Sequence, residues 1–266
     1  MTTKERVLEI LTQNQNKSVS GEVLAETCGI SRAAIWKAVK SLREQGCKIE
    51  GTTNGGYVLY GSADILTPET VSRELIKNYP HLSNSHIETF EIIDSTNTYA
   101  KRILSECGNL RTPYGELTPA GKKAHKSIYI AESQKAGRGR LGRTFFSPAK
   151  TGIYLTVIYA PEGGIINPAR LTAFAAVAVC RVVERLYNVK PSIKWINDIF
   201  VNGKKICGIL TEGSTNFETG LIESAIVGIG INISDNPEVF TKELAEIAGS
   251  LTGTKGSENV TRTQLA

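Results

Sequence analysis

Residues 134–148 read QKAGRGRLGRTFFSP, in which three glycines alternate with three arginines and no acidic residue occurs. Glycine lets the backbone turn freely and approach a ligand closely, and arginine offers a planar fork of donors suited to carboxylate and phosphate. This loop is therefore predicted to clamp an anionic small molecule. A solvated surface loop, or an arginine–glycine tail that binds nucleic acid, has the same composition. The strand-like segments on either side, 128–132 and 153–159, favour a loop inside a folded domain.

Length and composition predict a globular protein with two domains. The chain has 266 residues, 41% hydrophobic and 21% charged, and its net charge of +5 permits contact with nucleic acid without arguing for it. The cysteines are scattered, which favours a reducing, cytoplasmic setting. No signal peptide or membrane-spanning segment is predicted. The histidines lack ligand spacing, so neither a metal site nor histidine-based catalysis is predicted.

The first 60 residues carry a helix-turn-helix pattern. A helix is predicted over 4–13, and Ser20 caps a second helix that ends at Gly29, with Val23 and Leu24 facing inward. Ser31 caps a third helix over 32–45, ended by Gly46. Its inward face is Ile35, Val39 and Leu42, and its other face carries Arg32, Lys37, Lys40 and Arg43. Segments 48–50 and 57–60, around a glycine turn at 52–56, predict a β-hairpin that would form the wing of a winged helix.

A basic second helix of this kind predicts DNA binding, although small three-helix units also mediate protein contacts. The helix-turn-helix would run from Gly21 to Lys40. Lysine and arginine side chains on the helix would contact phosphates, and its N-terminal residues would lie near the groove floor. The residues expected to bind DNA are Ser31, Arg32, Ala33, Trp36, Lys37 and Lys40. One winged helix has a small footprint, so a dimer would be needed to read two half-sites.

Residues 61–66 are the expected linker, and a helix is predicted from Thr67 and Pro68 to Asn78. A strand over 88–93 leads into the polar run 94–97 and a helix over 98–107. That run either caps the helix or hydrogen-bonds a polar ring or anion. Residues 108–126 are predicted to be a long surface loop. A long helix from Asn167/Pro168 to Tyr187 is expected to pack on a sheet.

A hairpin is predicted around Asn202-Gly203, with strands 199–201 and 204–211. Alternation places Lys205 on the same face as Cys207 and Ile209. A lysine sheltered there needs an anionic partner, and an internal salt bridge with Asp198 is one possibility. The alternating glycines of the last strand, 221–233, indicate close approach of a ligand or another backbone. A helix is expected over 237–251. A capping box at 261–264 predicts a further helix, and its position at the end of the sequence is typical of a truncated chain.

Together these motifs resemble the bifunctional biotin protein ligases of bacteria, the biotin-operon repressor type. They occur in the family's order: 31–37 (SRAAIWK), 94–97 (DSTN), 134–140 (QKAGRGR), 194–198 (KWIND), 203–205 (GKK), 207–210 (CGIL) and 228–232 (GIGIN). The resemblance implies an α/β (α+β) fold, with a winged helix-turn-helix domain over 1–62. A biotin/lipoate-ligase-like catalytic domain with a mixed β-sheet flanked by helices would occupy 63–266. Compared with the family, the chain is expected to lack the C-terminal SH3-like domain.

The resemblance also implies the chemistry. Such an enzyme activates biotin with MgATP to biotinyl-5′-AMP and transfers biotin to a lysine of the carboxyl carrier protein of acetyl-CoA carboxylase. Lys205, Asp198 and Arg140 would be catalytic. Biotin would be bound by Ser95, Thr96, Asn97, Gln134, Arg138, Gly139, Arg140 and Lys205. The nucleotide would be bound by Arg140, Arg143, Phe145, Asn197, Gly208 and Asn232.

The resemblance implies a second role as a biotin-responsive repressor, in which ligand binding favours a homodimer that binds operator DNA. Two other functions fit the same sequence. One is a transcription factor that senses the ligand without transferring it, against which the presence of both Lys205 and Asp198 argues. The other is a related acyl ligase of the lipoate type, which the 134–148 loop and the winged helix disfavour.

Overall fold

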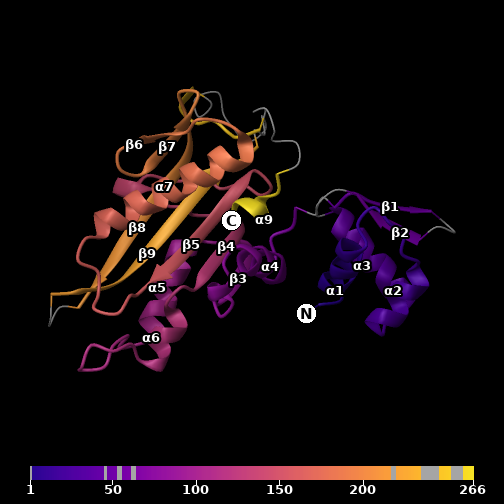
Figure 1. The fold of residues 1–266 in the computed structure, drawn as a ribbon, viewed down its shortest axis with the longest axis horizontal. Helices are drawn as coiled ribbons and strands as arrows, with labels where there is room; N and C mark the ends of the chain where they lie inside the picture. Colours follow the sequence, from indigo (N-terminus) through magenta and orange to yellow (C-terminus); the bar gives the residue numbers. More distant parts are fainter. Residues whose placement is uncertain are drawn as a thin grey trace. The chain divides into compact units, whose positions relative to one another are not determined.

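The computed structural model describes residues 2–44, 47–52, 56–60, 64–216, 220–234, 246–252 and 260–266. The chain forms two compact units, Met1–Ile65 and Leu66–Ala266 (Figure 1). Each unit has its own hydrophobic core.

The first unit has the predicted order of helices and hairpin. Its elements are α1 (Thr3–Gln13), α2 (Gly21–Cys28), α3 (Arg32–Glu44), β1 (Ile49–Thr52) and β2 (Gly56–Leu59). Ser20 caps α2 by accepting a hydrogen bond from Val23 N, and Gly29 ends the helix with φ of 67°. The strands pair antiparallel. The expected turn residues 53–55 and the expected helix end at Gly46 lie outside the described residues.

The core of the first unit is formed by one face of each helix. Its fully buried side chains include Val7, Leu11, Leu24, Ile35 and Leu42. The prediction that Val23 faces inward is wrong, because its side chain is 49% exposed. Successive helical residues point about 100° apart, so the inward direction of Leu24 turns its neighbour toward solvent.

The second unit is built on a seven-stranded mixed sheet with the order β3-β4-β5-β9-β8-β7-β6. Only the β3–β4 pair among these is parallel. The strands are β3 (Ile87–Ile93), β4 (Ile128–Gln134), β5 (Gly152–Tyr159), β6 (Ser192–Lys194), β7 (Asp198–Val201), β8 (Lys204–Thr215) and β9 (Ile222–Asn232). The helices are α4 (Pro68–Asn78), α5 (Thr96–Glu106), α6 (Pro119–Ala124), α7 (Pro168–Tyr187) and α9 (Arg262–Leu265), with short 3-10 turns η1 (Pro80–Leu82) and η2 (Arg140–Gly142).

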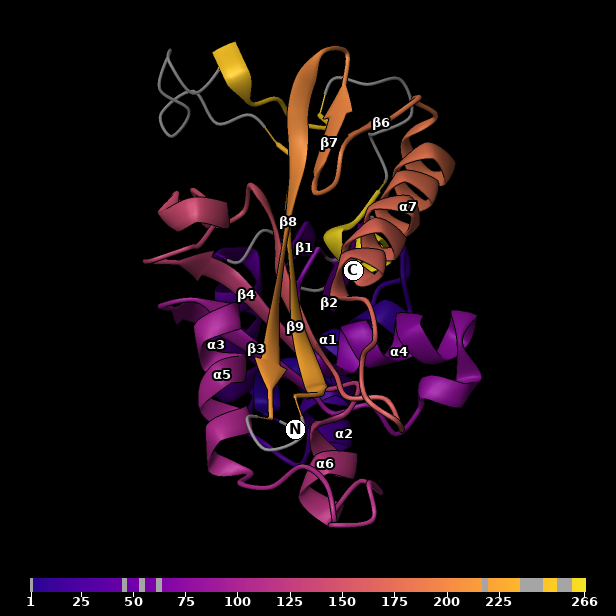
Figure 2. The ribbon, with the colours of Figure 1, turned by 90° about the vertical axis from the view of Figure 1, so that its left-hand side faces the viewer.

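The two faces of this sheet have different roles. Figure 2 shows α7 on one side of the sheet and α5 on the other. Alternate residues of β5 and β9, such as Leu155 and Val227, pack in the large core under α7, whereas Ile158 and Ile226 pack in a smaller core with α5. Helix α5 covers only part of its face. The rest of that face is free to carry a pocket.

Helix α7 follows the predicted signals. Asn167 caps it by accepting a hydrogen bond from Ala169 N at 3.1 Å, Pro168 occupies its first turn, and Asn188 ends it in the left-handed conformation. Its fully buried residues Ala176 and Val183 face the sheet, as expected for a helix packed there.

Two expectations for this unit are wrong. Residues 108–126 are not only loop, because they contain α6, which Thr118 caps. A Cβ at Gly121 would lie 2.3 Å from Leu110 O, so α6 is held against the chain before it. Helix α5 begins at Thr96 rather than Thr98, because Ser95 is its N-cap.

The expected helix over 237–251 lies largely outside the described residues. In the described part, Ala248 forms an isolated parallel bridge with Lys205. The capping box at Thr261 is confirmed and begins α9. Arg262 of this helix is 5% exposed, and its Nη1 lies 2.6 Å from Glu132 Oε1.

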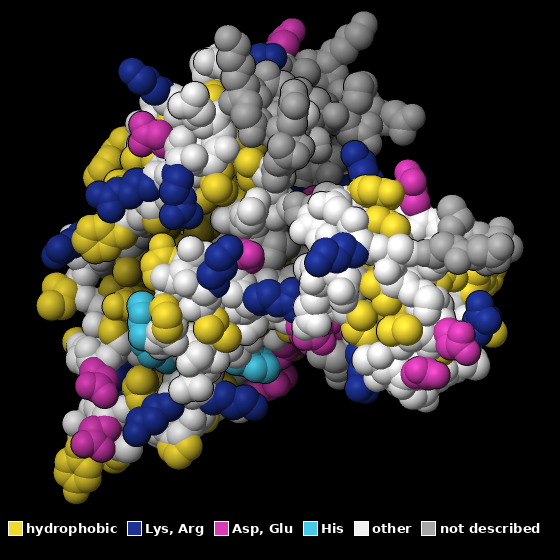
Figure 3. Space-filling model, turned by 45° about the vertical axis from the view of Figure 1, so that its right-hand side comes forward, with side chains coloured by type: hydrophobic (Ala, Val, Ile, Leu, Met, Phe, Trp, Pro, Cys, Tyr) yellow, Lys and Arg dark blue, Asp and Glu magenta, His cyan; other side chains and the backbone are white. Residues whose placement is uncertain are grey.

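On the face in Figure 3, Lys and Arg side chains are spread among acidic and apolar ones, in keeping with the modest net charge of +5. Within the part of the chain that is described, no helix is long and apolar enough to cross a membrane.

Because the core of the first unit is small, the stability of this unit should be sensitive to shortening a core side chain. Leu42→Ala removes a side chain that is 0% exposed and should lower the free energy of unfolding of this unit by about 2–5 kcal/mol. That is a large part of the stability of a domain of this size. Denaturant unfolding followed by circular dichroism would measure it, with the exposed-site variant Lys37→Ala as control. Equal stability of the two variants would contradict this packing.

Candidate functional site

A pocket lies on the α5 face of the sheet, over a floor of glycines. Gly208 of β8 and Gly228 and Gly230 of β9 line it. A Cβ at Gly228 would lie 2.1 Å from Asn97 Oδ1, and one at Gly230 would lie 2.4 Å from the Phe145 ring. Glycine is therefore required here so that side chains from α5 and from the 134–148 loop can lie against the sheet. The atoms that approach these glycines closely belong to side chains, whereas the sequence predicted a ligand or another backbone.

The 134–148 loop folds back on itself to cover the pocket. Gly139 N donates to Arg143 O at 2.7 Å, and Phe145 N donates to Gly137 O at 2.9 Å. A Cβ at Gly137 would lie 2.2 Å from Phe145 O, so this turn also requires glycine. The loop is thus an ordered internal hairpin, which excludes the alternative of an arginine–glycine tail.

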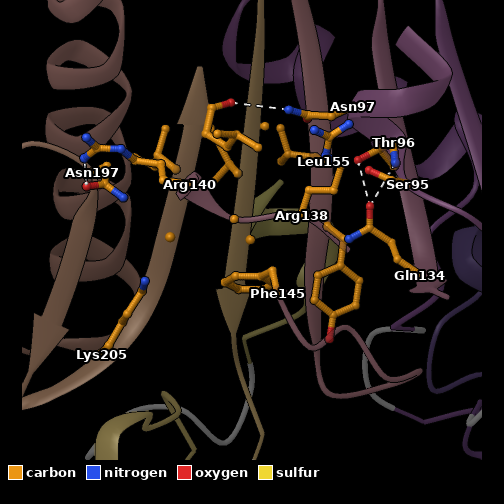
Figure 4. Close-up of a pocket in the computed structure, with 18 residues that line it drawn as sticks. Ser95, Thr96, Asn97, Gln134, Arg138, Arg140, Phe145, Leu155, Asn197 and Lys205 are labelled. Carbon is orange, nitrogen blue, oxygen red and sulfur yellow. Dashed lines mark hydrogen bonds between the residues drawn. The ribbon is translucent and has the colours of Figure 1, made fainter. Parts of the chain in front are cut away.

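One end of the pocket, called the uncharged end below, is lined mainly by neutral polar side chains, and Arg138 of the loop also lies on this side, beside Glu212 (Figure 4). Gln134 Oε1 accepts hydrogen bonds from Thr96 N at 2.9 Å and Thr96 Oγ1 at 3.1 Å. Ser95, Thr96 and Asn97 are each less than 5% exposed and sit at the start of α5. Ser95 accepts from Thr98 N, so the capping interpretation of the 94–97 run is confirmed, and the same residues also line the pocket.

The opposite end is cationic and is built from the loop and the β6–β8 region. Arg140 Nη1 donates to Asn197 Oδ1 at 2.7 Å, which joins the loop to the residue before β7. Lys205 Nζ lies 2.7 Å from Asp198 Oδ1, confirming the internal salt bridge that the sequence allowed. Figure 4 shows Arg140, Asn197 and Lys205 on the side opposite Thr96 and Gln134, with Phe145 between them.

The predicted face of Lys205 is wrong. The pairing of β7 with β8 shifts register between Ile199 and Phe200, so that one extra residue of β8 is accommodated. Such a bulge interrupts the strict alternation of side chains. Cys207 and Ile209 pack in the core under α7, whereas a Cβ at Gly208 would lie 3.3 Å from Lys205 Cε. The bulge therefore turns Lys205 into the pocket.

A carboxylate, Glu212 of β8, lies beside the uncharged end. Its Oε1 accepts from Lys101 Nζ at 2.7 Å and lies 3.8 Å from Arg138 Nη2. Burial opposes ionisation, but the hydrogen bonds from Lys101 and Asn97 and the nearby charges of Lys101 and Arg138 outweigh it and lower the pKa of Glu212. Glu212 therefore carries its negative charge at neutral pH and offsets part of the loop's positive charge.

Most of the residues predicted to bind ligand line this one pocket. They are Ser95, Thr96, Asn97, Gln134, Arg138, Gly139, Arg140, Phe145, Asn197, Lys205 and Gly208. Asp198 reaches it through its salt bridge to Lys205. Two residues are placed elsewhere: Arg143 is exposed on the loop, and Asn232 donates to Gly249 O at 3.2 Å.

Sequence reasoning missed several lining residues and three that support the site. The missed lining residues are Tyr154, Leu155, Ile209, Leu210 and Ile229, whereas Gly228 and Gly230, which also line the pocket, belong to the glycine pattern noted in the last strand. The supporting ones are Ser147, Thr156 and Glu212, each bonded to a predicted residue. Period-two alternation of β5 and β9 is the signal that would have placed Tyr154, Thr156 and the glycines on one face. Among the described residues, no group of three or more His, Cys, Asp or Glu is placed to hold a metal ion.

The expected DNA-binding side chains lie on the exposed part of α3. Ser31 caps this helix by accepting from Ala34 N. Ser31, Arg32, Ala33, Lys37 and Lys40 are exposed, and Trp36 is 54% exposed with Lys40 Nζ 5.6 Å from its ring centre. Arg43 instead donates its Nε to Ile49 O at 2.7 Å, which ties α3 to the hairpin.

This combination defines a protein in which a helix-turn-helix unit is joined to a ligase-type α/β unit. The Biotin/lipoate A/B protein ligase family matches residues 89–232, and an HTH domain matches residues 3–58. The chain belongs to the biotin/lipoate A/B protein ligase family and carries an N-terminal helix-turn-helix domain. The predicted fold class is confirmed.

Curated relatives share this two-part organisation over much of the chain. The bifunctional ligase/repressor BirA of Bacillus subtilis is 33% identical over 97% of this chain and 73% of its own length. BirA of Escherichia coli is 32% identical over 81% of this chain and 59% of its own length. A structure of the biotin protein ligase from Aquifex aeolicus in complex with biotin and ATP has a TM-score of 0.52 and 24% identity, covering 68% of this chain and 65% of that one. This last likeness concerns the fold.

The glycine floor yields a direct test of the pocket. In Gly230→Ala the new methyl group would lie 2.4 Å from Phe145, so the ring must move. We expect the free energy of unfolding to fall by about 1–3 kcal/mol, as for an overpacked core. Denaturant unfolding would measure this loss.

Gly213→Ala is the matched control, because it lies on β8 outside the pocket. Its Cβ would meet the Ile222 side chain at 3.2 Å and Ser224 O at 3.9 Å, both milder contacts than the one at Gly230. If Gly230→Ala were as stable as Gly213→Ala, the close packing of Phe145 on the floor would be wrong.

Proposed function

We propose that this protein is a biotin protein ligase that also acts as a biotin-responsive repressor. It activates biotin with ATP to biotinyl-5′-AMP and passes biotin to a lysine of a carboxyl carrier protein, that of acetyl-CoA carboxylase. The observation that carries this proposal is the two-ended pocket. An uncharged hydrogen-bonding end suits a polar ring, and a cationic end suits the carboxylate and phosphate that must react. The names of the curated relatives support it.

In the first step a biotin carboxylate oxygen attacks the α-phosphorus of ATP, and pyrophosphate leaves. No proton is transferred, but two anions must be brought together, so positioning and charge stabilisation supply the catalysis. In this proposal Lys205 would contact both anions, and Arg140, which lines the same end from the loop, would assist it. Mg²⁺ enters with ATP and offsets the charge of its phosphates. Phe145, Asn197 and Gly208 are the pocket residues nearest the cationic end that would meet the nucleotide.

In the second step the acceptor lysine attacks the acyl carbon, and AMP leaves. The attacking amine must first lose a proton. Asp198 is the carboxylate at this end, and its Oδ1 is held by Lys205 at 2.7 Å and by Asn197 Nδ2 at 2.9 Å. When Lys205 turns to the adenylate, Asp198 becomes available to orient the incoming lysine and take its proton.

The enzyme activity is tested by mixing the protein with biotin, MgATP and a biotin carrier domain and reading the mass of the carrier. We expect the carrier to gain one biotinyl group. Lys205→Ala should lose most of this activity and most of the biotin-dependent release of pyrophosphate, because it removes the cation that joins the two anions. The neighbouring exposed lysine gives the control Lys204→Ala, which should behave as wild type.

The same assay separates the alternatives. Adenylate formation without a mass gain on the carrier would favour a ligand-sensing regulator. A mass gain with lipoate but not biotin would favour a lipoate-type ligase. Normal pyrophosphate release by Lys205→Ala would contradict the role assigned to that residue.

For the repressor function we propose that the adenylate favours a homodimer whose two α3 helices read an operator in the cytoplasm. Exposed Lys37 and Lys40 on α3 would contact phosphates, and Arg32, Ala33 and Trp36 would lie nearest the bases. The helix-turn-helix match over residues 3–58 supports this assignment.

The phosphate contacts predict a change in salt dependence. Lys37→Ala or Lys40→Ala should weaken binding to a duplex selected from random-sequence DNA, and each should reduce the slope of log affinity against log salt by about 1. Fluorescence anisotropy at several salt concentrations would measure this. Lys17→Ala, exposed before α2, is the control; an unchanged slope in both α3 variants would contradict DNA binding through this helix.

A further inference from the structure

Glu212 is a carboxylate at the pocket that neither the sequence motifs nor the proposed chemistry uses. It lies on β8 with 21% of its side chain exposed. Its two oxygens have different partners: Oε1 accepts from Lys101 Nζ at 2.7 Å, and Oε2 accepts from Asn97 Nδ2 at 3.0 Å. Lys101 is one turn along α5 from Asn97, so a single helix supplies both donors.

Asn97 joins this carboxylate to the pocket floor. It is 4% exposed, and its Oδ1 accepts from Thr156 Oγ1 at 2.7 Å. The same Oδ1 lies over Gly228, where a Cβ would be only 2.1 Å away. The amide thus turns its nitrogen toward Glu212 and its oxygen toward the floor of the uncharged end.

The orientation of an asparagine amide depends on its partners, because its oxygen and nitrogen ends have almost the same shape. The Thr156 hydroxyl does not settle the choice, since a hydroxyl can both donate and accept. The ionised Glu212 carboxylate favours one orientation, because it can only accept, and the carbonyl of Leu210, which accepts from Asn97 Nδ2 at a longer 3.4 Å, favours the same one. With Oε2 of Glu212 on one side, Nδ2 of Asn97 must face it, and the reversed amide would set two oxygens against each other.

Gln134, on the other side of the same end, has its own fixed partner. Its Nε2 donates to Ser147 Oγ at 2.9 Å, and Ser147 Oγ donates to Phe145 O, a backbone carbonyl that can only accept. This contact directs Gln134 Oε1 toward Thr96. The uncharged end is therefore bounded by acceptors that cannot donate: Phe145 O behind Gln134, and Glu212 with the more distant Leu210 O behind Asn97.

We propose that Glu212 is a positioning residue for the ligand ring. It acts through Asn97, whose orientation it fixes so that an acceptor oxygen faces the floor of the uncharged end and selects a ring that carries an N–H donor. The inference rests on the proposed function, since biotin is the ring-bearing ligand. It adds a residue that acts on ring recognition rather than on the reacting atoms.

Lys101 makes the inference testable with a nearly isosteric change. In Glu212→Gln the ammonium of Lys101 attracts the oxygen of the new amide, which leaves the nitrogen of that amide facing Asn97. Asn97 can bond that nitrogen only by reversing, which gives up the weaker contact of its Nδ2 with Leu210 O at 3.4 Å and brings its own nitrogen to the floor. Removing the lysine as well, in Glu212→Gln/Lys101→Met, frees the new amide to offer its oxygen to Asn97 again. Arg138 Nη2, which lies 3.8 Å from Oε1 of Glu212, still attracts the oxygen of the new amide, so only part of the biotin affinity should return.

The experiment measures the dissociation constant of biotin by calorimetry without ATP. We expect Glu212→Gln to weaken binding about tenfold, the loss expected for one buried hydrogen bond. The double variant should regain part of this affinity, and Lys101→Met alone should bind almost as wild type. The side-chain amide signals of Asn97 in a ¹H–¹⁵N spectrum should shift in Glu212→Gln and move back in the double variant.

Glu223→Gln is the matched control. Glu223 Oε1 accepts from Asn216 Nδ2 at 3.0 Å, the same kind of contact on the β8–β9 ladder but outside the pocket. This variant should bind biotin as wild type does. Thermal unfolding of all variants separates a loss of folding from a loss of recognition.

Two results would overturn the inference while leaving the proposed function intact. One is wild-type affinity in Glu212→Gln. The other is a double variant as weak as Glu212→Gln, which would assign the loss to charge alone. A wild-type protein that does not bind biotin would instead overturn the proposed function, and this inference with it.

Discussion

The pocket exists because strands β8 and β9 carry glycine at the positions that form its floor. Because Gly208, Gly228 and Gly230 have no side chains, the side chains of Asn97 and Phe145 lie directly on the backbone of the sheet. The opposite face of the same strands is apolar and packs under α7. One pair of strands thus supplies both the core that stabilises the unit and the hollow that holds a ligand. A methyl group added at Gly228 would displace Asn97, and one added at Gly230 would displace Phe145.

The cations around this hollow already have partners within the protein, which are carboxylates for Lys205 and Arg138 and a neutral amide for Arg140. Lys205 is paired with Asp198, Arg140 with Asn197, and Arg138 lies near Glu212. These pairs keep the cations ordered without a ligand. An anionic ligand must therefore displace these partners from the cations. Because the cationic side chains are already ordered, less conformational entropy is lost on binding. In the proposed reaction the exchange at Lys205 has a further consequence, because it releases Asp198 only once an anionic ligand has taken its place.

Local sequence signals predicted many of the helices, strands and turns. Contacts between residues distant in sequence decided the features that were missed. The Asn167/Pro168 cap placed α7, and Asn202-Gly203, both with positive φ, placed the β7–β8 turn. Helix α6 was missed because Gly121 packs on Leu110 in a segment with little periodicity. The direction of Lys205 was missed because a bulge resets alternation. Thr156 and Glu212 carry no motif, and their partner Asn97 lies 59 and 115 residues away.

The central claim is that one hollow holds the ring at its uncharged end and the acyl-phosphate at its cationic end. A crystal structure with a non-hydrolysable analogue of biotinyl-5′-AMP tests it most directly. We predict the ring between Asn97 and Gln134, and Lys205 Nζ moved from Asp198 to the oxygens that join the acyl group to phosphorus. An analogue bound elsewhere, or bound here with Lys205 still paired to Asp198, would contradict the account.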